Sequence, residues 1–465
     1  MAALSEKAIH RVANVFKRAG LRDPRRVARA VGLAENFAEN PGLSLPKIWS
    51  TPSQLKAGYQ FLRNPRNDFS LLMEAVQLAA RYAALEAKRV LVLHDTTDVA
   101  CPCADPDEVG HLQTGKAGFY VHHAFCVSAD SENRPLGMLW SDIWGRPQRS
   151  LARKRNLSGP ELAKLKHRES DRWLESITEA HLWAEGCDQV VHVMDREADF
   201  FRLFEHLTDL GADFVVRLRH DRATEESRLT ERLVDAPIKL ERLVELSARK
   251  QKTMPSYTHQ GRAARKAQLT VRCERVEFQP LKHMPDSEPV PVNILQVLEE
   301  NPPPGQRPVA WVLATSLPLK TKADVGRVID IYRARWQIEE LHKAIKTGCM
   351  LEKRQLESFE SITTLLALCY PIACELLRIR SRSRQTGIPA SDVLRQSLLD
   401  CLRAHPKARP LPDNPTAEQA LAVIAGLGGH IKHNGPPGWQ TLGAGYTALL
   451  AFEQGWLAAH AARDF

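Results

Sequence analysis

Two short apolar segments that each end in an aspartate constrain the fold of this chain more than any other feature of its sequence. Residues 90–93 are Val-Leu-Val-Leu, followed by His94 and Asp95, and residues 190–194 are Val-Val-His-Val-Met, followed by Asp195. Continuous apolar runs of this length are typical of strands buried on both faces of a sheet. If the two strands are neighbours, their ends bring the aspartates together. The sequence therefore predicts an α/β core with two adjacent carboxylates.

The segments around these two strands predict further strands and helices in alternation. Strand-like runs over 119–128 and 136–144 enclose the turn-rich stretch 130–135, which indicates a hairpin. The remaining elements are a helix over 160–186, a helix over 197–210 and a strand over 213–218. This order matches a ribonuclease-H-like layout, which requires a third carboxylate from a later helix.

The pattern changes after residue 220. Residues 268–277 alternate polar and apolar side chains, and two more strand-like runs follow at 292–298 and 309–315. They predict an inserted antiparallel β region over about 221–320. Two long helices are then expected, the first amphipathic, over 323–348 and 358–380, followed by a proline-containing linker over 405–415. We predict a helical basic domain over 1–70, a catalytic domain over 71–365 and a helical C-terminal domain over 366–465.

Positive charge is concentrated at the N-terminus. Residues 1–65 contain eleven lysines and arginines against four acidic residues, whereas the whole chain has a net charge of +9. Such asymmetry favours an anionic partner. Basic and aromatic residues interleave in this region, which predicts a DNA-binding surface; the alternative is a small helical domain with a solvated charged face. The candidate contacts are Arg25, Arg26, Arg29 and Lys56.

Composition argues against several other classes of protein. No apolar run approaches about 18 residues, so we expect no transmembrane helix and no membrane partner. The first ten residues lack the pattern of a secretory signal. Nine cysteines without a Cys-x-x-Cys pair favour reduced thiols in a cytoplasm over a disulfide framework or a structural zinc site.

The helix expected over 323–348 has one unusual face. On an uninterrupted helix, at about 100° per residue, four residues fall within about 60° of one another. They are Tyr332, Arg335, Glu339 and Lys346. A carboxylate among cations suits a site where metal and phosphate meet, although a solvated face with salt bridges has the same composition.

Several motifs in order resemble those of one family. Residues 332–346 read Tyr-Arg-Ala-Arg-Trp-Gln-Ile-Glu-Glu-Leu-His-Lys-Ala-Ile-Lys, which resembles the Y-x2-R-x3-E-x6-K signature of the IS4-type DDE transposases, the Tn5-like group. Asp95-Thr96-Thr97 resembles the first-aspartate motif of that family, and 195–199, Asp-Arg-Glu-Ala-Asp, resembles the second. Phe214–Arg217 and the segment around Trp311 are also similar. Asp98 departs from the pattern, because the family usually has an uncharged residue there.

The resemblance implies a ribonuclease-H-like core and a set of site residues. Asp95, Asp195 and Glu339 would hold two Mg²⁺ ions, for which Mn²⁺ would substitute. The residues implied in DNA contact, besides those of the N-terminal region, are Tyr332, Arg335, Lys346, Arg217, Lys343 and Trp311. Trp311 would stack near a base displaced from the duplex; without the resemblance, a core tryptophan on a strand is the better interpretation.

The implied function is that of a cut-and-paste DNA transposase. It would bind transposon ends as double-stranded DNA, cleave them through a hairpin intermediate and join them to target DNA as a homodimer. A same-fold DNA-binding protein and a nuclease for structured DNA are the alternatives. Apolar residues beyond 417 recur at helical spacing, so the tail either packs on the catalytic domain or forms the dimer contact. A DNA-associated protein of a bacterial cytoplasm is expected.

Three groups of residues have no single interpretation from the sequence. Arg196, Glu197 and Asp199 either orient the metal site or pair with one another. The arginines that alternate from Arg378 to Arg384 fit phosphate contact and a solvated face equally well. Four histidines near the aspartates are interpreted as structural, since the chemistry requires no histidine base. They are His94, His122, His123 and His192.

Overall fold

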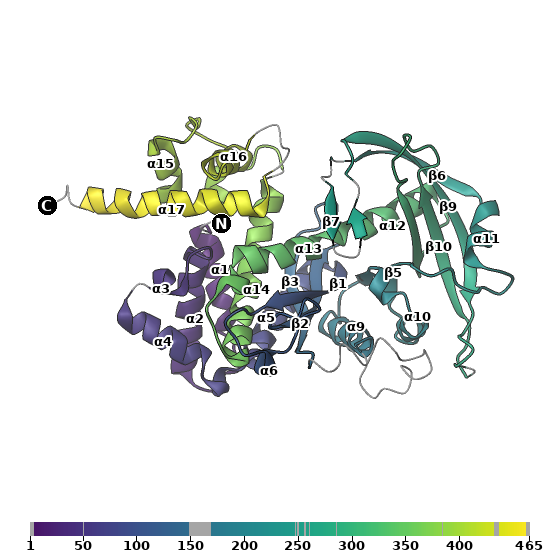
Figure 1. Cartoon of the computed structure of the whole chain (residues 1–465), viewed down its shortest axis with the longest axis horizontal. Coiled ribbons are helices and arrows are strands. Elements are labelled where there is room, and N and C mark those ends of the chain that lie inside the picture. Colours follow the sequence, from purple (N-terminus) through teal and green to yellow (C-terminus); the bar gives the residue numbers. More distant parts are fainter. Residues whose placement is uncertain are drawn as a thin grey trace.

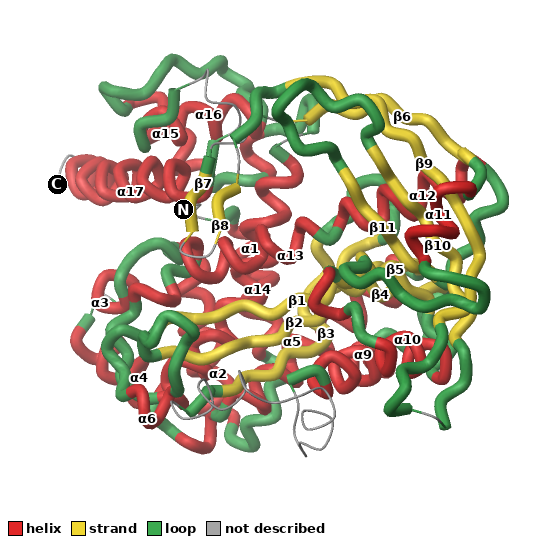
Figure 2. The backbone as a smooth tube through the Cα atoms, turned by 45° about the vertical axis from the view of Figure 1, so that its right-hand side comes forward, coloured by secondary structure: helices red, strands yellow, loops and turns green. Residues whose placement is uncertain are grey.

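A computed structural model describes residues 4–49, 51–147, 169–246, 248, 251–254, 257–259, 261–284, 286–383, 385–431 and 437–461. A nine-stranded sheet extends across the molecule, and helices from both ends of the chain gather at one side of it (Figure 1). Figure 2 shows the strands as one twisted surface, with β1 and its neighbours next to the helical part and β6, β9 and β10 far from it.

The N-terminal region consists of short helices with clear start signals. They are α1 (Glu6–Phe16), α2 (Pro24–Glu39), α3 (Leu45–Ile48), α4 (Pro52–Leu62) and the longer α5 (Phe69–Ala87). The helix start predicted at Thr51 is confirmed: its hydroxyl accepts a hydrogen bond from the Gln54 amide, and Pro52 occupies the first turn. Ser5, Asp23 and Asp68 cap α1, α2 and α5 in the same way.

The first five strands form the part of the sheet that was expected. They are β1 (Arg89–Ala100), β2 (Gly118–Ser128), β3 (Pro135–Trp144), β4 (Gln189–Met194) and β5 (Asp213–Arg217), in the order β3-β2-β1-β4-β5. β1 pairs in parallel with β4, and β4 with β5, whereas β1–β2 and β2–β3 are antiparallel. The predicted hairpin and the predicted adjacency of the two aspartate-bearing strands are both confirmed.

The first strand differs from its prediction at one end. Asp95 does not end β1, because the antiparallel pairing with β2 continues from Asp95 opposite His123 to Ala100 opposite Gly118. The parallel pairing with β4 stops at Leu93 opposite Val193. Asp95 therefore lies just past the point where β1 and β4 separate, and Asp195 directly follows β4.

The β region after residue 220 extends the same sheet. Its strands are β6 (Ile238–Leu246), β9 (Arg265–Phe278), β10 (Val290–Leu298) and β11 (Ala310–Thr315), and β11 pairs with β5. The small pair β7 (Lys252–Met254) and β8 (Tyr257–His259) lies outside the main sheet. The predicted antiparallel strands are present, but they continue the core sheet through β11 and do not form a separate sheet.

Shorter helices complete the catalytic core. They are α6 (Pro106–Val109), α9 (Asp171–Trp183), α10 (Phe201–Asp209) and α11 (Leu229–Asp235), with 3₁₀ turns at Pro65–Asn67, Arg196–Ala198, Leu351–Lys353 and Ala390–Asp392. The helix predicted over 160–186 is present as α9, and the part of that prediction before residue 169 falls outside the described residues.

The helix predicted over 323–348 is divided into three segments. They are α12 (Lys322–Ala334), α13 (Trp336–Lys343) and η4, a π-helix over Ala344–Gly348. At the first junction, the Arg335 amide bonds to the Tyr332 carbonyl, three residues back, and in the π segment the Cys349 amide bonds to the Ala344 carbonyl, five residues back. The predicted helix is therefore present, but a tight turn at Arg335 and a π segment divide it.

The long helix α14 (Phe359–Arg382) forms the centre of the helical part. Its length and apolar composition would suffice to cross a membrane, yet 94% of the apolar window is buried inside the fold. Such burial is typical of a core helix. α14 packs against α5, β3 and α4, and the domain boundary expected at residue 366 falls within it.

Three helices end the chain. They are α15 (Gln396–Ala404), α16 (Ala417–Leu427) and α17 (Trp439–Ala461). α17 packs on α15, α16 and η4, and its C-terminal end projects away from the rest of the molecule (Figure 1).

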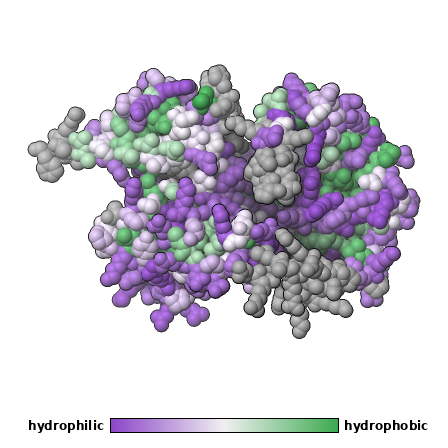
Figure 3. Space-filling model, viewed as in Figure 1, coloured by the Kyte–Doolittle hydropathy of each residue, from purple (hydrophilic) through white to green (hydrophobic). Residues whose placement is uncertain are grey.

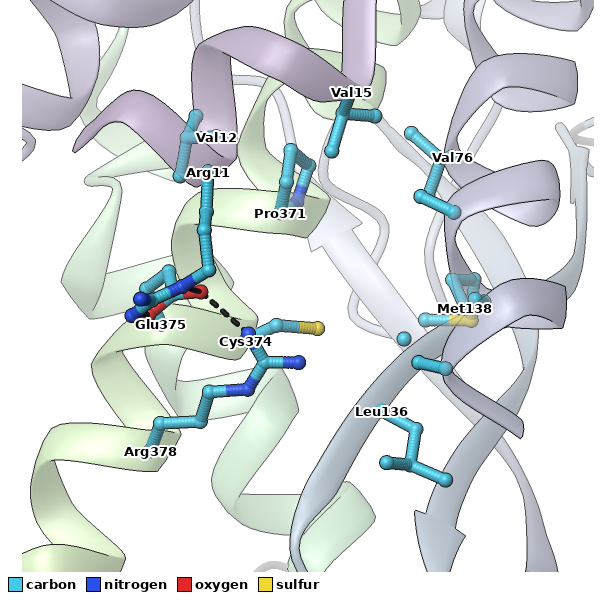
Figure 4. A pocket seen from close by; sticks show the side chains of 14 residues that line it. Arg11, Val12, Val15, Val76, Leu136, Met138, Pro371, Cys374, Glu375 and Arg378 are labelled. Carbon is cyan, nitrogen blue, oxygen red and sulfur yellow. Dashed lines mark hydrogen bonds and ion pairs between the residues drawn. The ribbon is translucent and has the colours of Figure 1, made fainter. Parts of the chain in front are cut away.

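An ion pair joins the N-terminal helices to α14. Arg11 of α1 donates two hydrogen bonds to Glu375, whose carboxylate also pairs with Arg378 at 2.5 Å (Figure 4). The contact borders a cavity of about 230 Å³ lined mainly by apolar side chains of α1, α5, β3 and α14. A second link comes from Arg354, which donates to the carbonyl oxygens of Pro41 and Leu43. The N-terminal helices are thus bound to the core by charged as well as apolar contacts.

Candidate active site

The three predicted carboxylates come from three adjoining elements at the centre of the molecule. Asp95 lies on β1, Asp195 follows β4, and Glu339 lies on α13. Figure 3 shows hydrophilic side chains around a hollow between the helical part and the far strands, where β1, β5 and α13 lie in Figure 1. The structure therefore brings the predicted residues to one region, although they are far apart in the sequence.

Electrostatic repulsion among these carboxylates is evident at Asp95. Burial raises the pKa of Asp95, and the nearby charges of Asp195, Glu197 and Glu339 raise it further, to about 8, although Arg335 opposes the shift. The Asp95 carboxylate accepts one hydrogen bond, from the Thr96 amide at 2.9 Å. Negative charge gathered around a buried carboxylate in this way favours an added cation.

Arg335 supplies positive charge between two of the carboxylates. Its guanidinium lies 2.7 Å from Glu339 Oε1 and 3.6 Å from Asp95 Oδ2. The Arg335 side chain is 13% exposed, so these contacts are only weakly screened by solvent. Arg335, predicted to contact DNA, therefore also contacts two of the carboxylates that were predicted to hold metal.

The donor atoms of the site suit a hard divalent cation. Three carboxylates leave open positions for water and phosphate oxygens, as Mg²⁺ prefers. In the described part of the chain, no group of three or more histidine, cysteine, aspartate or glutamate side chains is already close enough to hold a metal ion. Arg335 is the cation that contacts Asp95 and Glu339 in the structure, and a divalent ion would supply the same kind of counter-charge.

The interruption of the helix affects the four residues that were predicted to share one face. Tyr332 ends up 6% exposed, with its ring edge-on to Trp311 at a centroid distance of 5.4 Å. Trp311 is half-buried on β11. Tyr332 and Trp311 form one aromatic pair next to Arg335, whereas Lys346 lies beyond α13 on the π segment. The four residues therefore lie along successive helical segments, and Arg335 and Lys346 both contact aspartates of β1.

Lys346 is held by two carboxylates. Its ammonium lies 2.8 Å from Asp98 and 3.6 Å from Glu352. Glu352 in turn accepts a hydrogen bond from the Ala100 amide, so β1 and the 3₁₀ turn after η4 meet at this lysine. Asp98, noted in the sequence only as a departure from the family pattern, is thus a direct partner of Lys346.

Basic groups from β5 and its surroundings gather beside Asp195. Arg217 donates to the Ala310 carbonyl oxygen. Burial and the charges of Arg217 and Arg219 lower the pKa of Arg196, whereas Asp195 raises it, which places these groups near one another. Arg217, predicted to contact DNA, therefore belongs to a cationic group at the edge of the site.

Glu197 is a fourth carboxylate that the sequence did not assign. Burial and the charge of Asp195 raise its pKa. Asp199 has a different role: it accepts hydrogen bonds from the Arg219 and His220 amides and pairs with Arg222. Asp199 therefore holds the loop after β5 in place, while Glu197 lies close enough to Asp195 to be affected by its charge. The second-aspartate motif contains Glu197, but the motif alone does not show which groups the Glu197 side chain lies near.

The predicted DNA contacts outside the site are mostly exposed. Arg25, Arg29 and Lys56 are exposed on α2 and α4. Arg26 is half-buried and donates to the Arg66 carbonyl oxygen at 2.6 Å, so its side chain is engaged inside the N-terminal region. Lys343 pairs with Glu340 at 2.9 Å.

The histidines near the aspartates are buried and hydrogen-bonded. His94 bonds to Ser176 and His192, each at 2.9 Å, and His123 lies in a chain with His342 and Tyr370. Burial lowers the pKa of all four histidines interpreted as structural. Their interpretation as neutral core residues agrees with the structure.

The arginine run at the end of α14 is engaged by protein groups where it is described. Arg378 pairs with Glu375, Arg380 with Glu340 at 3.1 Å, and Arg382 with Asp392 at 2.9 Å. Arg384 falls outside the described residues. These contacts favour the structural interpretation over phosphate contact.

Two known protein families match this chain, one in the N-terminal region and one in the catalytic core. Residues 169–373 match the family described as Transposase DDE domain, and residues 11–67 match the family described as Transposase DNA-binding. The two ranges together cover more than half of the chain. Asp195 and Glu339 lie within the first range, Asp95 precedes it, and the N-terminal basic residues lie within the second.

These matches establish the activity at the level of the family. The mixed sheet with strand order β3-β2-β1-β4-β5 is the ribonuclease-H-like core of a DDE domain, and DDE transposases use divalent metal ions to cleave DNA and transfer its strands. The chain belongs to the IS4-type, Tn5-like DDE transposases, and is an enzyme with a DNA-binding domain followed by a catalytic DDE domain.

Proposed function

We propose that this enzyme is a cut-and-paste transposase whose catalytic residues are Asp95, Asp195 and Glu339. The observation that supports the proposal most strongly is the convergence of these carboxylates around Arg335, on elements that meet only in the folded chain. Two Mg²⁺ ions, when bound, would activate the attacking oxygen and stabilise the leaving 3′ oxygen. Asp95, Asp195 and Glu339 would hold them.

The cations around the carboxylates would bind the DNA backbone. Arg335 approaches the site from the junction between α12 and α13, Arg217 from β5 and Lys346 from the π segment. Because phosphate contacts position DNA without reading its sequence, these residues would orient the scissile strand. Arg25, Arg29 and Lys56, exposed in the matched DNA-binding region, would contribute most to binding of the transposon end.

The aromatic pair supports cleavage through a hairpin. Closing a DNA end into a hairpin requires sharp bending of the backbone, and a base can leave the stack at a cost of a few kcal/mol. Trp311 is half-buried and close to Arg335 through its contact with Tyr332. Stacking on an aromatic ring contributes about 1–3 kcal/mol per base. Trp311 would therefore receive the displaced base.

The far end of α17 would join two copies of the enzyme. Most apolar residues of the tail are buried within it, including Leu421, Ile424 and Leu449, so packing on the chain itself accounts for them. Leu457 is 54% exposed on the projecting end of α17, next to half-buried Trp456 (Figure 1). Because a transposase must hold two ends together, an isologous contact through this end gives the simplest paired complex.

Substitution of the three carboxylates tests the proposal. Asp95→Asn, Asp195→Asn and Glu339→Gln should each abolish Mg²⁺-dependent cleavage of end DNA while end binding stays close to that of the wild type. Asp330→Asn is the matched control, because Asp330 is an exposed carboxylate of α12 that pairs with Arg242 and Arg333. Robust cleavage by any of the three variants would remove that residue from the catalytic set.

The joined product separates transposition from the alternatives. An enzyme that cleaves ends and inserts their 3′ hydroxyls into a target plasmid is a transposase. Cleavage of branched DNA without joining would indicate a nuclease, and binding without cleavage would indicate a DNA-binding derivative.

A further inference from the structure

Glu340, the residue after the proposed metal ligand Glu339, is bonded to three different elements. Its carboxylate accepts from Lys343 of the same helix at 2.9 Å, from Arg380 of α14 at 3.1 Å and from the indole Nε1 of Trp439 at 2.8 Å. The Glu340 side chain is only 12% exposed. Glu339 instead bonds to Arg335. The two consecutive glutamates therefore have separate sets of partners, as expected for neighbouring residues about 100° apart on a helix.

The helix that carries them is short and has irregular helical turns at both ends. α13 has eight residues, between a tightened turn at Arg335 and the π segment η4. Irregular hydrogen bonding at both ends weakens the coupling of α13 to the neighbouring helical turns. Contacts with the surrounding elements must therefore set its orientation. Besides the Glu340 contacts, His342 bonds to His123 at 3.1 Å.

Trp439 is a firm anchor for such a contact. It begins α17, is 7% exposed, and has the Arg380 guanidinium over its ring at 5.0 Å. α17 also packs on η4, directly after α13. Buried hydrogen bonds between charged groups and an indole hold geometry well, because breaking one leaves an unpaired buried group.

We infer that Glu340 and Trp439 are positioning residues through which the C-terminal helix α17 sets the orientation of Glu339. The inference rests on the proposed role of Glu339. Any rotation of α13 that moves Glu339 away from the site must also break the Glu340 contacts with α14 and α17. The C-terminal region would thus support the catalytic carboxylate of its own subunit, in addition to any part in pairing two subunits.

Two conservative variants test this link. Trp439→Phe keeps a ring for Arg380 but removes the Nε1 donor, and Glu340→Gln keeps the shape of the side chain but removes its charge. Trp183→Phe is the matched control, since Trp183 packs in a separate apolar cluster and accepts a hydrogen bond from Arg81 through its carbonyl oxygen, which the substitution keeps. End binding and paired-end complexes should stay at wild-type levels in all three variants.

The expected defect lies in metal binding and in the order of α13. Mn²⁺ binding to the DNA-free protein, followed by electron paramagnetic resonance, should weaken about tenfold, as for other residues that support metal ligands. Amides of 336–343 should exchange hydrogen faster, while those of α14 keep their rates. Cleavage in preassembled complexes should slow by about tenfold or more. The double variant should be no worse than the more affected single variant, since both act on one link.

Two results would overturn the inference. One is wild-type Mn²⁺ affinity in both single variants. The other is loss of Mn²⁺ binding, end binding and cleavage in equal proportion, which a general loss of folded protein would produce. The proposed function fails separately: cleavage by Glu339→Gln would disprove it whatever Glu340→Gln does. An inactive Glu339→Gln with wild-type Mn²⁺ affinity in Glu340→Gln and Trp439→Phe would disprove only the link.

Discussion

Replacing Asp98 with asparagine should make the enzyme bind DNA of any sequence more tightly. Asp98 pairs with Lys346 at 2.8 Å, and Glu352 lies 3.6 Å from the same ammonium. A phosphate that uses Lys346 must compete with these carboxylates. In Asp98→Asn, one of the two competing charges is removed, while the size of the side chain is kept.

The magnitude follows from one additional contact between Lys346 and a DNA phosphate. Each such contact steepens the dependence of log K on log salt concentration by about 0.9, which at about 0.1 M salt corresponds to about eightfold tighter binding. The Asp98 side chain is 53% exposed, and exposed ion pairs contribute about 0–1 kcal/mol to stability. The substitution should therefore change DNA affinity without an appreciable loss of folded protein.

A double-mutant cycle with salt titrations provides the assay. Binding of a duplex without end sequence is measured between 50 and 200 mM potassium chloride, by fluorescence anisotropy, for the wild type, Asp98→Asn, Lys346→Gln and the double variant; these concentrations bracket the value of about 0.1 M used above. Glu108→Gln, an exposed carboxylate that follows β1 in sequence, controls for a general change in net charge. Asp98→Asn should steepen the slope, and Lys346→Gln should cancel that change.

Two results would refute the reasoning. If Glu108→Gln tightens binding as much as Asp98→Asn, the effect comes from overall charge and not from the ion pair. If Asp98→Asn tightens binding equally with and without Lys346, the lysine is not the group that Asp98 restrains.

Three further predictions concern other parts of the molecule. Replacing Arg25, Arg29 and Lys56 together with glutamine should weaken binding of end DNA and flatten its salt slope by up to about 3, and an unchanged slope would exclude this surface. Leu457→Glu should eliminate paired-end complexes on native gels while single-end binding persists, whereas Gln454→Glu, on the same helix, should not; equal pairing by both variants would exclude the end of α17 as the dimer contact. His122 and His123 are buried with pKa values lowered to about 3, so their neutral forms stabilise the fold fully above the unfolded pKa near 6.5, and that stability is lost as pH falls toward 3, by up to about 1.4 kcal/mol per pH unit for each histidine. Urea titrations of the wild type and His123→Gln between pH 4 and 7 should show a shallower dependence in the variant, and equal slopes would contradict the assignment.

The local sequence pattern was sufficient to predict an element where one physical rule determines its structure. The runs that became β1 and β4 are apolar on both faces, and only a central strand buries both faces of such a run. Thr51 and Pro52 satisfied the requirements of a helix start within three residues. These features need no knowledge of distant contacts, so the sequence could predict them.

Other features depend on partners that are far away in the chain. The continuation of β1 past Asp95 comes from its pairing with β2. The edge strand β6 alternates exposed and half-buried residues, with exposed Ile238 and Leu243, so its apolar pattern is weak. The breaks on either side of α13 have no proline or other strong local signal. Periodicity alone therefore favoured a continuous helix, whereas the structure has a tight turn at Arg335 and a π segment from Ala344.

The site residues were predictable by type but not by pairing. A motif can identify Asp95, Asp195 and Glu339, because each is a carboxylate in a fixed spacing. It cannot show that Glu197 lies near Asp195, that Asp199 pairs with Arg222, or that Glu340 bonds to Trp439. These contacts depend on how separate elements meet in the fold.

The pairing of charges at the site has a consequence for how its ligands bind. Arg335 lies against Glu339 and Asp95, and Lys346 lies against Asp98 and Glu352. At Arg335, a divalent ion held by the proposed ligands Asp95 and Glu339 would replace the guanidinium as their counter-charge and free it for a DNA phosphate. A phosphate that draws Arg335 away would likewise free the two carboxylates for the ion. Because linkage is reciprocal, metal ions should tighten DNA binding at this site by the same factor by which DNA tightens metal binding. Each ligand alone must instead break ion pairs that nothing replaces, so Mn²⁺ should bind the DNA-free protein measurably but more weakly than the protein with DNA.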